Sequence, residues 1–420
     1  MQFSTLLTRE QAPAVLLALL FGTFILLLPR FTDAAKTPFA LLILVASIHA
    51  LARFRQLGKC DGAERLFLAA VVVNFLWMAF SFYYNGSPGR GDTYLWGRHF
   101  YFLFLVPMFF MFRRIPLHSG MLVACIAASL LVSLADIAID YLRGISYRDG
   151  GMNMNKFGPI QLCLVGILAC YLPCLDARWK KFLAGSAIIA GLATVILSAS
   201  KASWLAIPVL CVFFIYYLQK QWSVARKTLV TILVMALLAS SYFLPLVKIR
   251  IDHLQQNAVA FINGEANPEL LGTFVARMYL WRAGWAIFTE QPITGAGLGS
   301  LRVKMKENHE HYQIPESVTR FKYTHNQYLS ALVTRGIPGL ILLLLVLIMP
   351  LYIAMNHKAK DREERAAQLS LLFIGITYLV VNLPDDHFEG KSATMFLSVM
   401  LALLLARISS GANQLTGAER

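Results

Sequence analysis

Charged residues are scarce in this chain. They make up 15% of its 420 residues, whereas an ordinary soluble domain has about 25%, and 57% of the residues are hydrophobic. The apolar residues form long unbroken runs and lack the periods of 2 or 3.6 residues that half-buried strands and helices show. Runs of about 20 apolar residues are membrane spans. This composition excludes a disordered chain, a collagen and a disulfide-rich secreted scaffold.

Cysteines and nucleotide-binding motifs are also sparse. Five of the six cysteines lie inside apolar runs, so we expect neither disulfides nor a CxxC metal site. The chain has no DxD pair, which disfavours a glycosyltransferase that uses a metal ion and a nucleotide sugar. Its glycine-rich segment, Gly295–Ser300, lacks the third glycine and the strand–helix–strand setting of a dinucleotide site. We interpret it as a tight turn that permits close backbone approach, and as a candidate anion nest.

The long apolar runs predict an all-α polytopic membrane protein with about twelve transmembrane helices. Their approximate ranges are 12–29, 38–53, 65–83, 98–113, 119–142, 157–174, 182–199, 202–218, 228–247, 329–355, 367–383 and 392–407.

The net charge of +15 follows the positive-inside rule of membrane proteins, so it does not indicate a nucleic-acid partner. With the N-terminus in the cytoplasm, the inside loops carry 19 Lys and Arg residues and the short outside loops carry 9. Both termini are then inside, and one large helical loop between helices 9 and 10 faces the periplasm. This gives three predicted parts: spans 1–9 in 1–247, the loop domain in 248–328, and spans 10–12 with a cytoplasmic tail in 329–420.

The loop is long enough to carry function. It contains a predicted helix from Pro268 to about Glu290, which ends before Pro292. Arg277, Trp281 and Trp285 recur at intervals of four residues and so share one face, as in a helix that lies at the membrane–water interface.

His325 is the candidate proton acceptor, because it lies where the loop enters the tenth span, in the segment Tyr323–Leu329. A helix N-terminus disfavours the charged imidazolium, so a neutral His at this place could accept a proton. The alternative is that His325 only caps the helix.

Several cations on the outward side are candidates for binding phosphate. They are Arg277 and Arg282 on the loop helix, Lys201 in the hairpin between spans seven and eight, and Arg98 and Arg250 at outer helix ends. Arg binds phosphate oxygens bidentately and Lys binds them as a point charge. For any one of them, the alternative is simple snorkelling to lipid headgroups.

Three acidic or histidine-containing groups remain. Asp136 and Asp140 lie one turn apart in the fifth span and could form a proton relay or pair with buried arginines. The clusters His309–His311 and Asp385–His387 resemble metal ligands but lack partners at helical spacing, so we predict no metal site and no cofactor.

The loop motifs together resemble the O-antigen ligase/polymerase family of bacterial inner-membrane glycosyltransferases. The matching residues are Arg277-Met278-Tyr279-Leu280-Trp281, Pro292, Gly295-Ala296-Gly297-Leu298-Gly299, His325-Asn326, Tyr328-Leu329 and Gly336. The segment Ser198–Lys201 resembles the family's Ser-Arg element, with Lys in place of Arg. This change keeps the charge but loses the bidentate fork.

The resemblance implies that a glycan is transferred from undecaprenyl pyrophosphate on the periplasmic face, with inversion and without a metal. Arg277, Arg282 and Lys201 would hold the pyrophosphate, with Arg98 and Arg250 as further binding cations. His325 would deprotonate the acceptor, and Tyr323 and Asn326 would orient it.

Three features favour an O-antigen ligase with a lipid A–core acceptor within this family. The chain is compact, it has one large outer loop, and that loop lacks the RX10G pattern of polymerases. The alternatives are an O-antigen polymerase or a protein O-oligosaccharyltransferase. A lipid-linked sugar transporter would belong to another class, and the chain shows no inverted halves that would suggest one.

The charge asymmetry predicts the accessibility of two positions. In intact cells, a membrane-impermeant thiol reagent should label Gly264→Cys and should not label Gly417→Cys. The reverse pattern would overturn the predicted orientation.

Overall fold

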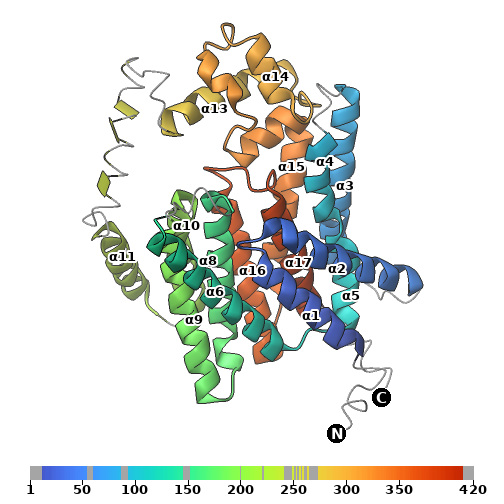
Figure 1. Cartoon of the computed structure of the whole chain (residues 1–420), viewed down its shortest axis with the longest axis vertical. Helices are drawn as coiled ribbons and strands as arrows, with labels where there is room; N and C mark the ends of the chain where they lie inside the picture. Colours follow the sequence, from blue (N-terminus) through green and yellow to red (C-terminus); the bar gives the residue numbers. More distant parts are fainter. Residues whose placement is uncertain are drawn as a thin grey trace.

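The computed structural model describes residues 12–53, 60–86, 93–144, 152–198, 200–219, 222–240 and 273–409, together with a few positions between 248 and 263. This part of the chain is built from helices without β-strands, and Figure 1 shows most of them gathered in one bundle. The longer helices are α1 (Ala12–Leu27), α2 (Thr32–Ala52), α3 (Gly62–Tyr84), α4 (Thr93–Leu103), α5 (Leu105–Arg114), α6 (Ser119–Leu142), α8 (Met154–Tyr171), α9 (Arg178–Leu197), α10 (Lys201–Leu218), α11 (Val224–Ser240), α13 (Thr273–Glu290), α15 (Gln327–Asn356), α16 (Arg362–Val381) and α17 (Lys391–Ile408).

Nine of the helices in the described residues are long and apolar enough to cross a membrane. The all-helical fold is therefore confirmed, whereas the count of twelve spans stays a prediction. Three predicted spans coincide with shorter elements: α1 has 16 residues, α11 has 17 described residues, and the fourth run is divided into α4 and α5 at Phe104.

The centre of the bundle is formed by α8, α16 and α17. Their apolar segments are 72%, 72% and 89% buried, whereas that of α10 is only 22% buried. Apolar side chains on the outer helices can contact lipid, whereas those of the three central helices are buried inside the bundle. The loops at the ends of the central helices are therefore held from several sides.

The helix α15 is broken at Gly336, whose φ of +66° lies in the left-handed region. The segment that follows α13 packs into this break. Ile337 donates its N–H to the Pro292 carbonyl at 2.8 Å, and a Cβ on Gly336 would lie 2.1 Å from the Ile293 oxygen. Only a glycine gives the two backbones room to approach this closely.

The glycine-rich segment meets α15 on the other side of the break. The N–H groups of Ala296 and Gly297 donate to the carbonyls of Val333 and Thr334, at 2.7 and 3.2 Å. The predicted close approach of backbones is therefore present. These two N–H groups are already used, so they do not serve the predicted anion nest.

A small helical domain forms one end of the molecule, at the top of Figure 1. It contains α13, α14 (Ser300–Glu307) and the 3₁₀ helix η5 (Glu316–Arg320), packed around their own apolar core. The helix α13 ends at Glu290, as predicted, and the predicted start at Pro268 lies outside the described residues. Its two tryptophans differ: Trp285 is exposed, whereas Trp281 donates its Nε1–H to the Thr324 carbonyl at 3.0 Å.

The two acids in the fifth predicted span pair with an arginine. Arg30, at the end of α1, lies 3.3 Å from Asp136 and 2.6 Å from Asp140 on α6. Of the two roles that the sequence left open for these acids, the structure favours the partner of a half-buried arginine.

The break in α15 predicts a strong effect of one methyl group. Gly336→Ala should destabilise the protein by more than about 2 kcal/mol, because it combines the cost of left-handed backbone with a clash against the backbone of Ile293. Gly185→Ala is the matched control, because this helical glycine has open space around it. Thermal unfolding of the purified variants would measure both, and equal melting temperatures would contradict the account.

Candidate active site

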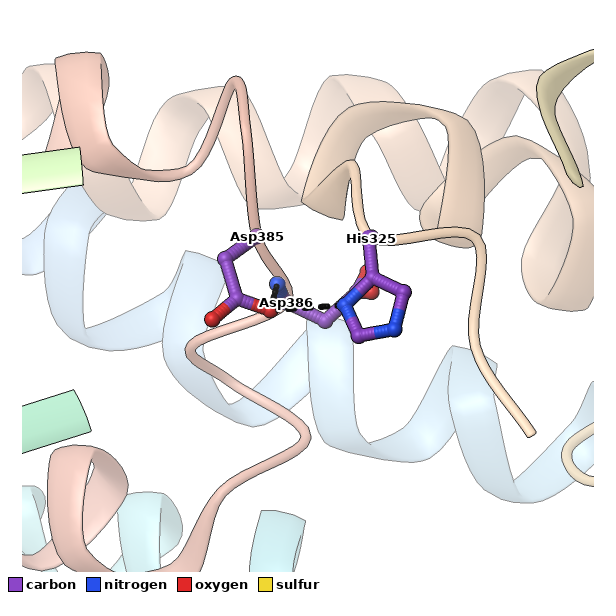
Figure 2. A group of neighbouring side chains, drawn as sticks. All are labelled: His325, Asp385 and Asp386. Carbon is purple, nitrogen blue, oxygen red and sulfur yellow. Dashed lines mark hydrogen bonds and ion pairs between the residues drawn. The ribbon is translucent and has the colours of Figure 1, made fainter. Parts of the chain in front are cut away.

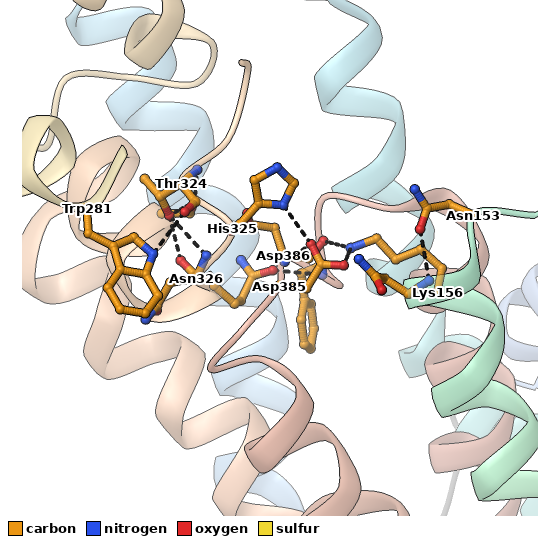
Figure 3. Close-up of polar contacts among 12 residues, drawn as sticks. Asn153, Lys156, Trp281, Thr324, His325, Asn326, Asp385 and Asp386 are labelled. Carbon is orange, nitrogen blue, oxygen red and sulfur yellow. Dashed lines mark hydrogen bonds and ion pairs between the residues drawn. The ribbon is translucent and has the colours of Figure 1, made fainter. Parts of the chain in front are cut away.

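Two loops meet at the end of the bundle that carries the helical domain (Figure 3). One is residues 321–326, which lead into α15, and the other is residues 382–390, which join α16 to α17. Gln327 connects them through two hydrogen bonds. It donates its N–H to the Asn382 carbonyl at 2.9 Å, and its Oε1 atom accepts the Phe388 N–H at 2.8 Å. The site is therefore built from segments about 60 residues apart in sequence.

His325 lies in the first loop with a φ of +53°. This left-handed conformation is uncommon for a residue other than glycine, and such strain concentrates at functional sites. Its neighbours hold it in place: the Thr324 hydroxyl donates to the Asn326 carbonyl at 2.8 Å and accepts the Asn326 N–H at 3.3 Å. A Cβ on Gly284 would touch Thr324 and Leu329, so α13 also supports this loop from behind.

Asp385 is the partner of His325 (Figure 2). Its Oδ1 lies 3.1 Å from the His325 Nδ1 atom, and its Oδ2 lies 3.3 Å from the Lys156 Nζ atom on α8. Burial by itself would raise the pKa of Asp385, but Lys156 and the hydrogen bond to His325 outweigh burial and hold the pKa well below its ordinary value. Asp385 is therefore a buried carboxylate anion.

Because a carboxylate only accepts hydrogen bonds, it selects the tautomer of the neutral imidazole. His325 then carries its proton on Nδ1, and Nε2 keeps the lone pair that can accept a proton.

The two residues after Asp385 have shifted pKa values as well. Burial, and then the charge of Asp385, raise the pKa of Asp386 to about 6. Burial, and then the charge of Lys156, lower the pKa of His387 to about 3, so its ring is neutral and packs against Tyr378 with ring centroids 5.7 Å apart. Of these three neighbouring residues, Asp385 is therefore the one that stays negatively charged to the lowest pH.

A third buried acid, Glu389, connects α4 to the site. Its Oε2 atom lies 3.2 Å from His99 Nε2, and this charge interaction outweighs burial and lowers the pKa of Glu389. Arg98 donates to the Tyr323 hydroxyl at 2.7 Å and to the Glu389 backbone carbonyl. Arg98 thus connects the loop of His325 to the loop of Asp385 through hydrogen bonds to both.

These groups line a cavity of about 690 Å³. Its walls come from the α1–α2 corner, the start of α8, α4 and both loops, and its charged lining residues are Arg30, Asp33, Arg98, Lys156, His325, Asp385, Asp386, Glu389 and Lys391. A cavity of this size suits a sugar-sized ligand, and a charged lining of this kind suits a polar one.

The predicted site residues are not all in this cavity. His325, Arg98 and Tyr323 line it. Arg277 is half-buried within electrostatic reach of Asp385 and Asp386; burial lowers its pKa and the two carboxylates oppose that shift. Four further predicted residues are not among the described residues that line the cavity: Lys201, Arg282, Asn326 and Arg250.

Lys201 begins α10, whose N-cap Ser200 packs against Gly158 on α8, two residues after Lys156. Arg282 is exposed on another face of α13. Asn326 uses its Oδ1 atom to cap α15, accepting the N–H groups of Tyr328 and Leu329 at 3.0 Å each. Arg250 lies outside the described residues.

Sequence reasoning missed Asp385 and Lys156 as parts of the site. The sequence suggests Asp385 only as a metal ligand together with His387, whereas the structure pairs it with His325. Lys156 is one of the nine Lys and Arg residues of the short outside loops. The available signal was that both are charged residues at outer ends of predicted spans, where the positive-inside rule gives Lys156 no reason to lie.

The atoms of His325, Asp385 and Asp386 that could ligate a metal lie within 4.8 Å of one another. However, both oxygens of Asp385 already face positive or proton-donating groups, Lys156 and His325. A cation placed here would meet the ammonium of Lys156, so the group fits an internal ion-pair network better than a divalent ion.

Taken together, the helices and this site define a multi-pass helical membrane protein with a charged cavity at one end of its bundle. Residues 186–344 match the family model described as O-Antigen ligase. This stretch contains α13, the glycine-rich segment Gly295–Ser300, His325 and Gly336. Over these residues the chain is similar to the O-antigen ligase family, and the resemblance seen in its motifs is confirmed.

A relative from Haemophilus influenzae, to which no function is assigned, is 23% identical over 301 residues. The alignment covers 69% of this chain and 72% of that protein.

The cap of α15 predicts different outcomes at neighbouring positions. Asn326→Ala should lower the free energy of unfolding by about 1 kcal/mol, because it removes the N-cap. His325→Asn should lower it by less than this, because Asn tolerates a positive φ and the Asp385 carboxylate keeps its contacts with Lys156 and the Asp386 N–H. Thermal unfolding would compare the two, and a larger loss for His325→Asn would show that His325 is mainly structural.

Proposed function

We propose that this protein is an O-antigen ligase. It transfers a polysaccharide from undecaprenyl pyrophosphate to a hydroxyl of a lipid A–core acceptor, on the periplasmic face of the inner membrane. The observation that carries this proposal is the pair His325–Asp385 on the wall of a sugar-sized cavity, with His325 inside the stretch that matches the O-antigen ligase family.

In the proposed reaction His325 is the general base. Its Nε2 takes the proton of the acceptor hydroxyl as the oxygen attacks the anomeric carbon of the donor sugar. The bond from that carbon to the pyrophosphate oxygen breaks, and the configuration inverts because attack comes from the opposite side. Asp385 does not take the proton; it orients the ring and stabilises the imidazolium that forms.

The leaving group needs positive charge more than it needs a proton, because a pyrophosphate is already a stable anion. In our proposal Arg277, Arg282 and Lys201 hold it, and Arg250 assists. Arg277 is the best placed of the described candidates, since it is half-buried and lies within electrostatic reach of Asp385, the partner of His325. Arg98 lines the cavity, but its contacts with Tyr323 and Glu389 favour a positioning role.

This mechanism requires no metal ion, because the cations stabilise the leaving pyrophosphate and the base takes the proton of the acceptor hydroxyl.

Two members of the same family remain alternatives: a polymerase, which would use a second lipid-linked glycan as acceptor, and a protein O-oligosaccharyltransferase. A transporter for a lipid-linked sugar would form no new glycosidic bond and so would need no base beside an acceptor hydroxyl.

The test is to incubate the purified protein in detergent with a lipid-linked glycan and lipid A–core, with and without EDTA. A joined product in both samples is expected. Elongated lipid-linked glycan would indicate a polymerase, and no product from any acceptor would indicate a transporter. Loss of product on chelation, restored by a divalent ion, would reject the metal-free mechanism.

The base assignment predicts a large loss of turnover on mutation. His325→Ala and His325→Gln should each lower the rate by about 10²–10⁴-fold, because neither side chain can replace the base. Asp385→Asn should also be slow, because an amide can present its N–H to Nδ1 and so favour the wrong tautomer. Donor binding should persist in all three variants. An active His325→Asn variant would defeat the assignment.

The cation assignment predicts graded effects. Arg277→Ala and Arg282→Ala should each weaken donor use by about 1.5–3 kcal/mol, as expected for hydrogen bonds to a charged group. Lys201→Arg should retain more activity than Lys201→Ala, because the family position carries Arg. Steady-state kinetics with varied donor would measure this, and full activity of Lys201→Ala would show that Lys201 only snorkels to lipid.

A further inference from the structure

An exposed apolar patch surrounds the turn after α13. It consists of Phe80 and Tyr84 on α3, Ile293 in the turn and Ile337 on α15, which are between 46% and 67% exposed. The rings of Phe80 and Tyr84 stack with centroids 5.5 Å apart. Isolated exposed apolar side chains are ordinary, but a cluster drawn from three separate elements marks an interaction surface.

Backbone contacts hold the turn against both helices. The Ser81 hydroxyl donates to the Thr294 carbonyl at 2.7 Å, and Ile337 donates its N–H to the Pro292 carbonyl at 2.8 Å. The position of Ile293 relative to α3 and α15 is therefore fixed.

The depth of the turn follows from α3. This helix has 23 residues, so it is about 35 Å long and its end at Tyr84 reaches the membrane–water interface. Ser81 precedes that end by three residues, or about 5 Å along the axis. The turn thus lies below the end of a helix that crosses the membrane.

The break in α15 indicates the same depth in the membrane for the turn after α13. From Ile337 to Asn356 the helix carries no Asp, Glu, Lys or Arg, and these 20 residues span about 30 Å, whereas Arg335 lies just before the break. The exposed faces of both helices continue away from the patch as apolar surface, through Leu76 on α3 and Ile341 on α15. Such faces in a membrane protein contact lipid.

We propose that the turn Pro292–Thr294 is seated in the lipid of the membrane, so that the domain of α13 and α14 rests on the bilayer surface. Ile293 and Ile337 contact lipid chains, and Phe80 and Tyr84 lie at the headgroup level, as aromatic side chains do at membrane interfaces. Because α13 packs on the loop of His325, this seat fixes the height of the cavity above the lipid.

The test uses a cysteine-free variant labelled with bimane at Ile293→Cys and reconstituted in nanodiscs that contain phospholipids with a nitroxide near the headgroup. Leu76→Cys is the control for a lipid-facing position, and Lys306→Cys, exposed on α14, is the control for a water-facing position in the same domain. The label at Ile293→Cys should be quenched far more than the label at Lys306→Cys, because a group about 5–10 Å into the interface lies near the nitroxide.

A label at Ile293→Cys that is quenched no more than the one at Lys306→Cys would overturn the proposal. Disulfide cross-linking of Ile293→Cys between two copies, without quenching by lipid, would also overturn it and would show that a second copy covers the patch. Neither readout depends on glycan transfer, so the result is independent of the proposed function.

Discussion

The site depends on one buried negative charge, that of Asp385. A carboxylate shielded from water is costly unless it is paired and hydrogen-bonded. Lys156 from α8, His325 from the loop before α15 and the N–H of Asp386 together meet this need. Three separate parts of the chain are therefore drawn to one point, and the geometry that makes His325 a base is also the geometry that stabilises the charge.

The surrounding scaffold holds this arrangement from both sides. The loop of His325 is fixed by the cap on α15, by the hydrogen bond from Trp281 and by the packing of α13. The loop of Asp385 hangs between α16 and α17, which lie at the buried centre of the bundle. Arg98 then joins the two loops through Tyr323 and the Glu389 carbonyl. Rigid central helices with short connections can hold a strained residue such as His325.

Much of the fold could be predicted from the sequence, because apolar runs depend only on local composition. Nine of the predicted spans coincide with described helices that are long and apolar enough to cross a membrane, and α13 ends at Glu290, just before Pro292. His325 was found because it lies at a predicted helix start within a family motif.

The pairing of His325 with Asp385 could not be predicted in this way, since it joins residues 60 positions apart in different loops. The same holds for the contact between Gly336 and Ile293, which is made by two backbones and leaves only a pair of glycine motifs as its trace in the sequence. The role of Asn326 as the cap of α15 could not be predicted either, because the helix starts one residue later than a capping His325 would place it.

The most direct measurement is the tautomer of His325, by ¹⁵N nuclear magnetic resonance of histidine-labelled protein at mildly alkaline pH, with the signal assigned by its loss in His325→Asn. The account predicts a proton on Nδ1 and a free lone pair on Nε2, because the Asp385 carboxylate accepts a hydrogen bond from Nδ1. A proton on Nε2 in the wild type would contradict it, since that nitrogen could not then accept the proton of an acceptor hydroxyl.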